Sequence, residues 1–299
     1  MSCINILGML INKTIIHLSI IISLVLYLWE CSSTKKEITT AQNQNVDFLI
    51  EQGELYWEQR SDSSSIIKAD HFLSLANDRR PEDFELSVLY SRVMYFRALF
   101  IEKDITLRDS LFSRGANVAK HSVITHKEFQ SIYETTQGDS SFRLLSALAN
   151  TPRVLVPGLF WWATNQVWYL NSKPAMERLN SREILEVIMH RIISLEPDYF
   201  YGGPYRFFGL FYTRIPGVEL IQSKTYFEQA LANHPEYMGN AVQMSEFYNQ
   251  KAGNRNQFHT QLKLVVSKDP TTNPEILPEN LFYQDRARSL LEQESILFE

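Results

Sequence analysis

Residues 182–199 read REILEVIMHRIISLEPDY, and this stretch carries the pattern that decides the fold. From Ile184 to Ile193 its apolar residues recur at i, i+1, i+4, i+5, i+8 and i+9, which is the spacing of one face of an α-helix. Pro197 follows, and proline cannot continue a helix because it lacks a backbone N–H and its ring clashes with the preceding turn. The stretch therefore predicts an amphipathic helix that a proline closes.

The same pattern recurs along the chain. KTYFEQALANHPEY (224–237) and FHTQLKLVVSKDP (258–270) each set a proline after an amphipathic segment, and ADHFLSLANDRRPEDFE (69–85) holds an earlier copy. The later prolines lie at positions 197, 235 and 270, and are therefore 38 and 35 residues apart. A period near these values is typical of tetratricopeptide-like repeats. We therefore predict that residues 46–299 are an all-α domain, a superhelical stack of degenerate tetratricopeptide-like helical hairpins.

Composition agrees with this fold class. Of the 299 residues, 44% are hydrophobic and 12% aromatic, so the chain can bury a core. Only 11 are glycine, which is too few for a turn-rich all-β fold, and no segment shows sustained strict alternation of apolar and polar residues. The net charge is −5 and no dense basic patch is present, so we expect no nucleic-acid partner.

The N-terminus has the pattern of a secretory signal. Residues 14–28 are a 15-residue apolar run, which is short for a membrane span and suits a signal peptide over residues 1–30. Cys31 ends the run and resembles the lipidated cysteine of a bacterial lipoprotein, with residues 31–45 as a flexible linker. We expect a membrane-anchored periplasmic protein, on either membrane; an uncleaved N-terminal anchor is the alternative.

Residue types needed for catalysis are not arranged as known motifs require. Cys3 and Cys31 are the only cysteines, so the mature body has no thiol for a disulfide, a thiolate zinc site or a nucleophile. No G-x-S-x-G, G-x-G-x-x-G, P-loop or H-E-x-x-H motif occurs, and no two histidines stand four residues apart. We expect no enzyme activity, no cofactor and no metal site.

The segment GGPYRFFG (202–209) has two interpretations. In the functional one, Gly202 and Gly203 let the backbone approach a ligand, and Arg206 projects as a partner for an anion. In the structural one, the glycines make a tight turn between repeats, Pro204 begins a helix, and Arg206 caps or pairs with a neighbour.

Aromatic residues gather near this segment. Trp161, Trp162 and Trp168 could line a cavity for an apolar ligand or pack the core between hairpins. Phe208 and Tyr212 belong to a helix that is apolar almost all round, which places it at the inner wall of a superhelix or against another subunit. Lys173 and Arg143 show no partner in the sequence and are expected to be solvated surface charges.

Three segments resemble a known family. WWATNQVWYLNSKP (161–174), EPDYFYGGPYRFFGLFYTRIPG (196–217) and KTYFEQALANHPEY (224–237) are similar to the T-component of tripartite ATP-independent periplasmic (TRAP) transporters. The resemblance implies a periplasmic lipoprotein of degenerate tetratricopeptide-like repeats. It also implies association with the solute-binding P-component and a trimer with a channel through each protomer.

Two functions follow as hypotheses. The first is a lipid-anchored accessory protein that docks a periplasmic solute-binding protein and binds or channels a small, partly apolar solute. The second is an envelope scaffold lipoprotein that binds other proteins through its repeat surface, without a solute. An aromatic-lined cavity favours the first, and an open groove without a cavity favours the second.

Overall fold

The computed structural model describes residues 44–299. Cys31, the predicted signal peptide and most of the predicted linker lie outside the described residues, so these assignments stay predictions. Residues 50–299 form one compact unit. None of the helices in the described part is both long and apolar enough to cross a membrane.

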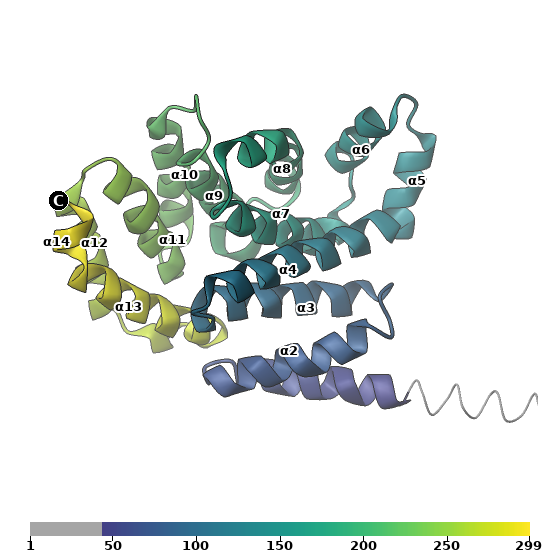
Figure 1. Cartoon of the computed structure of the whole chain (residues 1–299), viewed down its shortest axis with the longest axis horizontal. Helices are drawn as coiled ribbons and strands as arrows, with labels where there is room; N and C mark the ends of the chain where they lie inside the picture. The colour runs from purple at the N-terminus through teal and green to yellow at the C-terminus, as the bar shows by residue number, and fades with distance from the viewer. Residues whose placement is uncertain (1–43) are drawn as a thin grey trace, which may run out of the picture. The chain divides into compact units, whose positions relative to one another are not determined.

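All regular structure from residue 44 onward is helical, which confirms the predicted all-α stack (Figure 1). A first helix runs to residue 58. The following α-helices are α2 (Ser63–Asn77), α3 (Phe84–Phe96), α4 (Ile105–Thr125), α5 (Lys127–Thr135), α6 (Ser140–Ala149), α7 (Val156–Leu170), α8 (Ala175–Leu195), α9 (Tyr199–Tyr212), α10 (Leu220–Asn233), α11 (Met238–Gln243), α12 (Arg255–Ser267), α13 (Leu277–Glu292) and α14 (Glu294–Leu297). Two π-helical segments, η1 (Arg97–Ile101) and η3 (Met244–Asn249), extend α3 and α11.

Local chemistry sets where the helices begin and end. Asp62, Asp83, Asp104 and Asp139 cap α2, α3, α4 and α6, and each side chain accepts a hydrogen bond from a backbone N–H of the first turn. The closing prolines act as the sequence predicts, because α8, α10 and α12 end two or three residues before the prolines at 197, 235 and 270.

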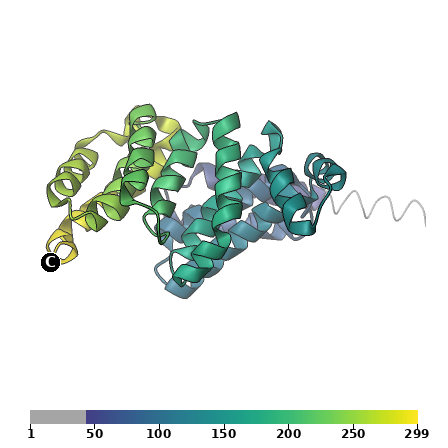
Figure 2. The ribbon, with the colours of Figure 1, turned by 90° about the horizontal axis from the view of Figure 1, so that it is seen from above.

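Most helices pack against a neighbour in the chain. The pairs with the most extensive contact are α4 with α7, α9 with α10, α3 with α4, α7 with α8, α2 with α3, and α12 with α13. Because α4 packs directly on α7, the α5–α6 hairpin is an insertion in the sequence between two helices that contact each other. In Figure 2 the helices from teal to yellow follow one another across the unit.

The α9–α10 pair is close because of one glycine. A Cβ atom on Gly209 would lie 2.6 Å from Cγ of the buried Phe227, so only glycine lets the two helices meet at this distance. The hydroxyl of Ser223 donates to the Gly209 carbonyl at 2.6 Å. The α9–α10 contact therefore depends on the absence of a side chain at Gly209.

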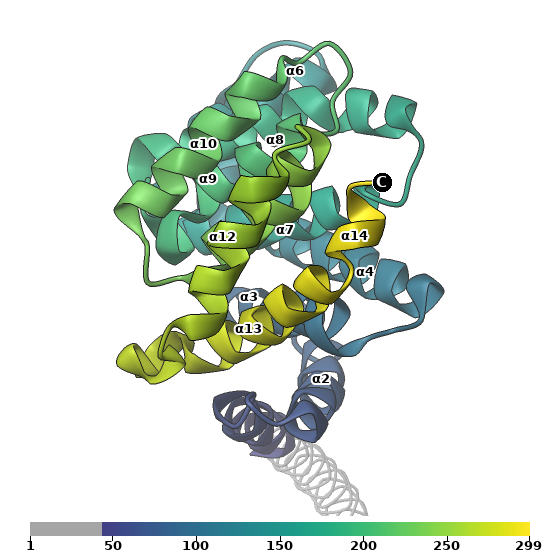
Figure 3. The same cartoon turned by 90° about the vertical axis from the view of Figure 1, so that its left-hand side faces the viewer.

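The last long helix returns to the start of the compact unit. Figure 3 shows α13 passing beside α3. The ring of Phe282 on α13 lies 5.4 Å from that of Phe96 and 5.2 Å from that of Phe100. Glu279 on α13 pairs with Arg60 and Arg92, so helices more than 180 residues apart in sequence are joined by charge as well as by rings.

Candidate functional site

A left-handed turn leads into the regular part of α9. After Pro197 stops α8, Phe200, Tyr201 and Gly202 adopt φ values of 49°, 57° and 70°. Glycine reaches this region without strain, whereas a residue with a side chain loses about 1–2 kcal/mol there. Such strain persists only where the surroundings hold it. Pro204 then lies in the first turn of the regular helix, as the structural interpretation of the glycine pair expects.

Arg206 holds this turn. Its Nη1 donates to the Tyr201 carbonyl at 3.1 Å and to Oδ1 of Asn240 at 2.7 Å, and its Nη2 donates to the Phe200 carbonyl at 3.2 Å. The residue is 5% exposed, and its guanidinium lies over the ring of Tyr237 at 4.5 Å from the centroid. Within residues 44–299 no carboxylate pairs with it. Its charge is therefore buried among neutral groups.

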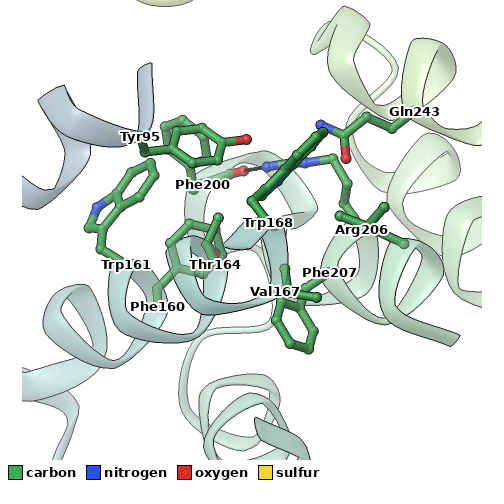
Figure 4. Close-up of a pocket in the computed structure, with 12 residues that line it drawn as sticks. Tyr95, Phe160, Trp161, Thr164, Val167, Trp168, Phe200, Arg206, Phe207 and Gln243 are labelled. Atoms are coloured by element: carbon green, nitrogen blue, oxygen red, sulfur yellow. Dashed lines mark hydrogen bonds between the residues drawn. The ribbon is translucent and has the colours of Figure 1, made fainter. Parts of the chain in front are cut away.

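An aromatic cavity lies beside Arg206, between α3, α7, α9 and α11 (Figure 4). Its free space is about 10 Å³, which is room for about one water molecule. The aromatic side chains that line it are Tyr95, Phe160, Trp161, Trp168, Phe200 and Phe207. Rings give rigid apolar walls, and in this structure they close almost all of the space between them.

Three polar residues also line the aromatic cavity: Arg206, Gln243 and Thr164. Nε2 of Gln243 donates to the hydroxyl of Tyr283 at 2.7 Å. Thr164 is 7% exposed, and its hydroxyl is buried without a hydrogen-bond partner among the described residues. A buried hydroxyl without a partner costs about 1–3 kcal/mol, so Thr164 is a polar group that the fold itself does not satisfy.

Two wider cavities flank the aromatic one along α9. The first, about 580 Å³, lies at the N-terminal end of α9, and Phe200 lines both it and the aromatic cavity. The second, about 470 Å³, lies at the C-terminal end and is lined by Thr213 and Phe247. The Phe247 ring is 5.7 Å from the ring of Trp168, which lines the aromatic cavity. The three cavities therefore follow one another along a single helix.

The flanking cavities differ in charge. The first is lined by two arginines and two glutamates, whose charges cancel. The second, which we call the cationic cavity, is lined by Arg178, Arg214, Lys251 and Glu246, a sum of 3 − 1 = +2. Glu246 is already paired with Arg286. Burial, reinforced by the nearby Arg178, lowers the pKa of Arg214, and the charge of Glu246 opposes this shift only in part.

The family model of the TRAP transporter T-component matches residues 104–298, which is more than half of the chain. The chain belongs to this family. No curated protein matches the chain. The match begins where α4 begins and includes α7, α9 and α11, so most of the aromatic cavity lies inside the part shared with other T-components.

Four of the residues predicted from sequence meet at one place in this T-component. Trp161, Trp168, Gly203 and Arg206 all line the aromatic cavity. A Cβ atom on Gly203 would lie 2.6 Å from Cε2 of Phe160, so a side chain there would collide with the cavity wall.

The other predicted residues lie elsewhere. Trp162 is buried away from the aromatic cavity, with the Lys120 ammonium 5.6 Å from its ring centroid. Phe208 and Tyr212 pack on Tyr226 of α10, with ring centroids 4.8 and 5.7 Å apart. Gly202 serves the left-handed turn. These positions do not line the aromatic cavity.

Two expectations about surface charges were wrong. Lys173 is not a lone solvated charge, because its Nζ lies 3.0 Å from Oδ2 of Asp109 on α4, and this hydrogen bond raises the pKa of Lys173. Nε of Arg143 donates to the Tyr133 carbonyl at 3.1 Å, and the guanidinium stacks over the Tyr133 ring at 4.2 Å. Asp109 is 64 residues from Lys173, so periodicity could not reveal that pair.

Tyr95, Gln243 and Thr164 line the aromatic cavity but were not predicted from sequence. Each is an ordinary member of a helix, and no local motif distinguishes it. Burial raises the pKa of Tyr95 well above its usual range, and it raises the pKa of Tyr199 beside the cavity to about 12. Both tyrosines therefore stay neutral at physiological pH, and among residues 44–299 Arg206 is the one charged side chain that lines the aromatic cavity.

Proposed function

We propose that this T-component docks a periplasmic solute-binding protein and binds a small, partly apolar solute in the aromatic cavity. Family membership gives the accessory role in TRAP transport. The observation that carries the proposal is the row of three cavities along α9, with aromatic walls at its centre. Aromatic walls with a few polar groups are typical of small-molecule sites.

Passage of a solute along this row needs side chains to move. The aromatic cavity has room for about one water, so Phe200 at one end and Trp168 at the other act as barriers. Trp168 is only half-buried, and its movement toward the cationic cavity would widen the space. We propose that solute binding or passage is accompanied by such a movement.

The docking surface is separate from the aromatic cluster. Stable protein–protein contact needs about 1,200–2,000 Å² of buried surface with exposed anchors. Large aromatic side chains could serve as such anchors, but the tryptophans and phenylalanines of α7 and α9 are almost all buried. The partner therefore docks at a mouth of the cavity row, while the aromatic residues serve the solute.

Co-purification with the genomically adjacent solute-binding protein tests the docking part. Association is expected with both proteins folded and solute supplied. Lack of association at tens of micromolar, a range in which transient partners still bind measurably, would contradict it. For the solute part, Trp168→Ala should weaken binding, whereas Trp162→Ala, which changes a buried tryptophan outside the cavity, should not.

We also propose that Cys31 carries a lipid anchor in the periplasm and that the protein forms a homo-oligomer, a trimer by family resemblance. Cys31→Ala should release the protein from membranes or leave it unprocessed. Unchanged attachment with an intact N-terminal segment in mass spectrometry would indicate an uncleaved anchor instead.

The envelope scaffold is the second candidate, and the small free volume of the aromatic cavity favours it. A scaffold binds protein partners through its repeat surface and needs no solute. Partner association that is unaffected by Trp168→Ala, together with no solute binding, would support it.

A further inference from the structure

We infer that the cationic cavity at the C-terminal end of α9 binds the phosphate group of a small phosphate ester. This cavity is lined by other residues than the aromatic cavity, so the inference does not depend on the solute binding proposed above. It follows from three cations that meet at one cavity, from the way in which each of them is held, and from the size of the cavity.

The three cations come from separate parts of the chain. Arg178 belongs to α8, Arg214 follows the end of α9, and Lys251 follows η3. Nε of Arg178 donates to the carbonyl of Arg214 at 3.1 Å. Nζ of Lys251 donates to the carbonyl of Thr213, the preceding residue. The fold therefore brings all three charges to the turn that follows α9.

Backbone carbonyls hold these cations, and within residues 44–299 no carboxylate forms an ion pair with any of them. Nη1 of Arg178 donates to the Leu170 carbonyl at 3.2 Å, and Nη1 of Arg214 donates to the Asn171 carbonyl at 3.3 Å. Such contacts at the ends of α7 and α9 orient the side chains and offset part of their charge, but a carbonyl carries no full charge. Among the described residues, Nη2 of Arg178 and both Nε and Nη2 of Arg214 make no hydrogen bond and can donate to a ligand.

The carboxylate of Glu246 leaves most of this charge in place. Glu246 is the one acidic residue among the described residues that line the cavity, and it already accepts hydrogen bonds from Nε and Nη2 of Arg286. Besides burial, the charge of Arg178 lowers the pKa of Arg214, so these two cations are close enough to repel each other. An anion between them would remove that repulsion.

A phosphate group suits this arrangement better than a carboxylate. A phosphate monoester carries close to two negative charges at neutral pH, which matches the sum of +2 on the lining residues. Its three oxygens point in different directions, so cations from three sides can each reach one, whereas a carboxylate offers one charge and two oxygens. Arginine binds phosphate through two N–H groups, and lysine binds it as a point charge.

The cavity also has room for the rest of a small ester. Its volume is about 470 Å³, which exceeds that of a phosphate group with its first waters. Phe247 and Leu297 line it as well and offer apolar contact to an organic group. The phosphate could belong to a free ester or to the headgroup of a lipid, and both present the same chemistry to the three cations.

The first test compares three-carbon probes on the full chain by calorimetry at constant ionic strength: glycerol 3-phosphate, glycerate and glycerol. We expect glycerol 3-phosphate to bind with a dissociation constant below about 1 mM and at least about fivefold more tightly than glycerate. Glycerol should not bind, and added salt should weaken the binding of glycerol 3-phosphate. Equal affinity for glycerol 3-phosphate and glycerate overturns the inference, and so does a lack of glycerol 3-phosphate binding up to about 10 mM.

A second probe distinguishes the two sources of phosphate. Dihexanoyl phosphatidic acid is water-soluble and adds two short acyl chains to the same headgroup. If it binds more tightly than glycerol 3-phosphate, and Arg214→Gln removes this gain, the ligand is a lipid headgroup. Equal or weaker binding indicates a free phosphate ester. Both results support a phosphate site.

An arginine pair of variants tests the site itself. Arg214 is exposed, so Arg214→Gln should fold, and it should weaken glycerol 3-phosphate binding by about fivefold, the effect of one charge about 4 Å away in water. Arg79→Gln is the matched control, because Arg79 is also exposed and donates to a helix-end carbonyl, that of Leu75, but does not line the cavity. Equal affinities in the two variants would overturn the inference.

A lysine pair repeats the comparison from another part of the chain. Lys251→Gln should weaken glycerol 3-phosphate binding to a similar extent. Lys268→Gln should leave it unchanged, although Nζ of Lys268 also donates to a backbone carbonyl, that of Pro235 at 2.8 Å. Each control changes the net charge by the same amount as its partner, so a loss of affinity in both members of a pair would assign the effect to net charge and overturn the inference.

Replacing Glu246 should have the opposite effect. Glu246→Gln removes the negative charge that lines the cavity, so glycerol 3-phosphate should bind about twofold to fivefold more tightly. A purely structural role of the three cations predicts no such gain. Asp285→Asn is the control, since it breaks an exposed ion pair with Arg288 away from the cavity. Circular dichroism accompanies every variant, and a folded Glu246→Gln variant without a gain in affinity would overturn the inference; if a variant does not fold, the probe series on the unchanged chain decides.

Discussion

Replacing Glu279 by glutamine tests how charge joins the two ends of the helical unit. Oε1 of Glu279 accepts hydrogen bonds from Nε of Arg60 at 3.3 Å and from Nη2 of Arg92 at 3.1 Å, and Oε2 accepts from Nη2 of Arg60 at 3.3 Å. Glu279 is 1% exposed. Glutamine keeps the shape of the side chain but removes its charge and leaves two cations facing each other.

The expected loss follows from the exposure of the two arginines. Breaking a buried ion pair on one side costs about 3–5 kcal/mol. The Arg60 side chain is 9% exposed and regains little water, whereas that of Arg92 is 28% exposed and can turn partly toward water. We therefore expect the free energy of unfolding to fall by about 3 kcal/mol, the lower end of that range. For an m-value of about 3 kcal/mol/M, this loss lowers the urea midpoint by about 1 M.

Urea unfolding of the full chain, followed by circular dichroism and tryptophan fluorescence, measures this loss. Glu275→Gln is the matched control, because this exposed neighbour contacts Arg60 only through its backbone carbonyl; it should change stability by less than about 0.5 kcal/mol. Replacing Arg60, Arg92 and Glu279 together by methionine should recover most of the loss. A loss below about 1 kcal/mol in Glu279→Gln would refute the role given to this charge.

Further predictions concern α9, α14 and the helix content. Gly209→Ala should destabilise the protein by about 1–2 kcal/mol in urea unfolding, since overpacking against Phe227 outweighs the higher helix propensity of alanine; a gain in stability would contradict this. The hydrogen bond from Arg255, followed by that from His259, lowers the pKa of Glu294. Because the pKa of Glu294 is lower in the folded than in the unfolded chain, its ionised carboxylate stabilises the fold at pH values above the unfolded pKa of about 4.3. This contribution is lost as the pH falls through the folded-state pKa. In Glu294→Gln, the free energy of unfolding should therefore decrease less steeply as the solution is acidified. Far-ultraviolet circular dichroism should show a helical spectrum; one dominated by strand would be incompatible with the fold.

The sequence alone predicts the all-α class and the helices that the prolines at 197, 235 and 270 close. The apolar face of residues 182–199 forms a helix because of residues within one or two turns of each other, and each closing proline ends a helix by its effect on the adjacent backbone. Periodicity and backbone chemistry therefore suffice to predict these helices and where they end. Gly209 is predictable for the same reason, because a glycine on an otherwise bulky apolar helix face indicates close approach. The glycine pair before Pro204 likewise marks a turn followed by a helix.

Only the tertiary structure decides which side chains share a cavity. Trp161 and Trp162 are adjacent in sequence, yet one lines the aromatic cavity and the other does not, because neighbouring residues on a helix point about 100° apart. Tyr95 and Gln243 reach the same space from helices that are 148 residues apart (243 − 95 = 148). Whether Arg206 meets a carboxylate is likewise decided by the residues that the fold places around it, and among the described residues these offer neutral oxygens. Periodicity identifies the buried face of each helix, but the facing partner is set by how distant helices pack, and that packing carries no local signal.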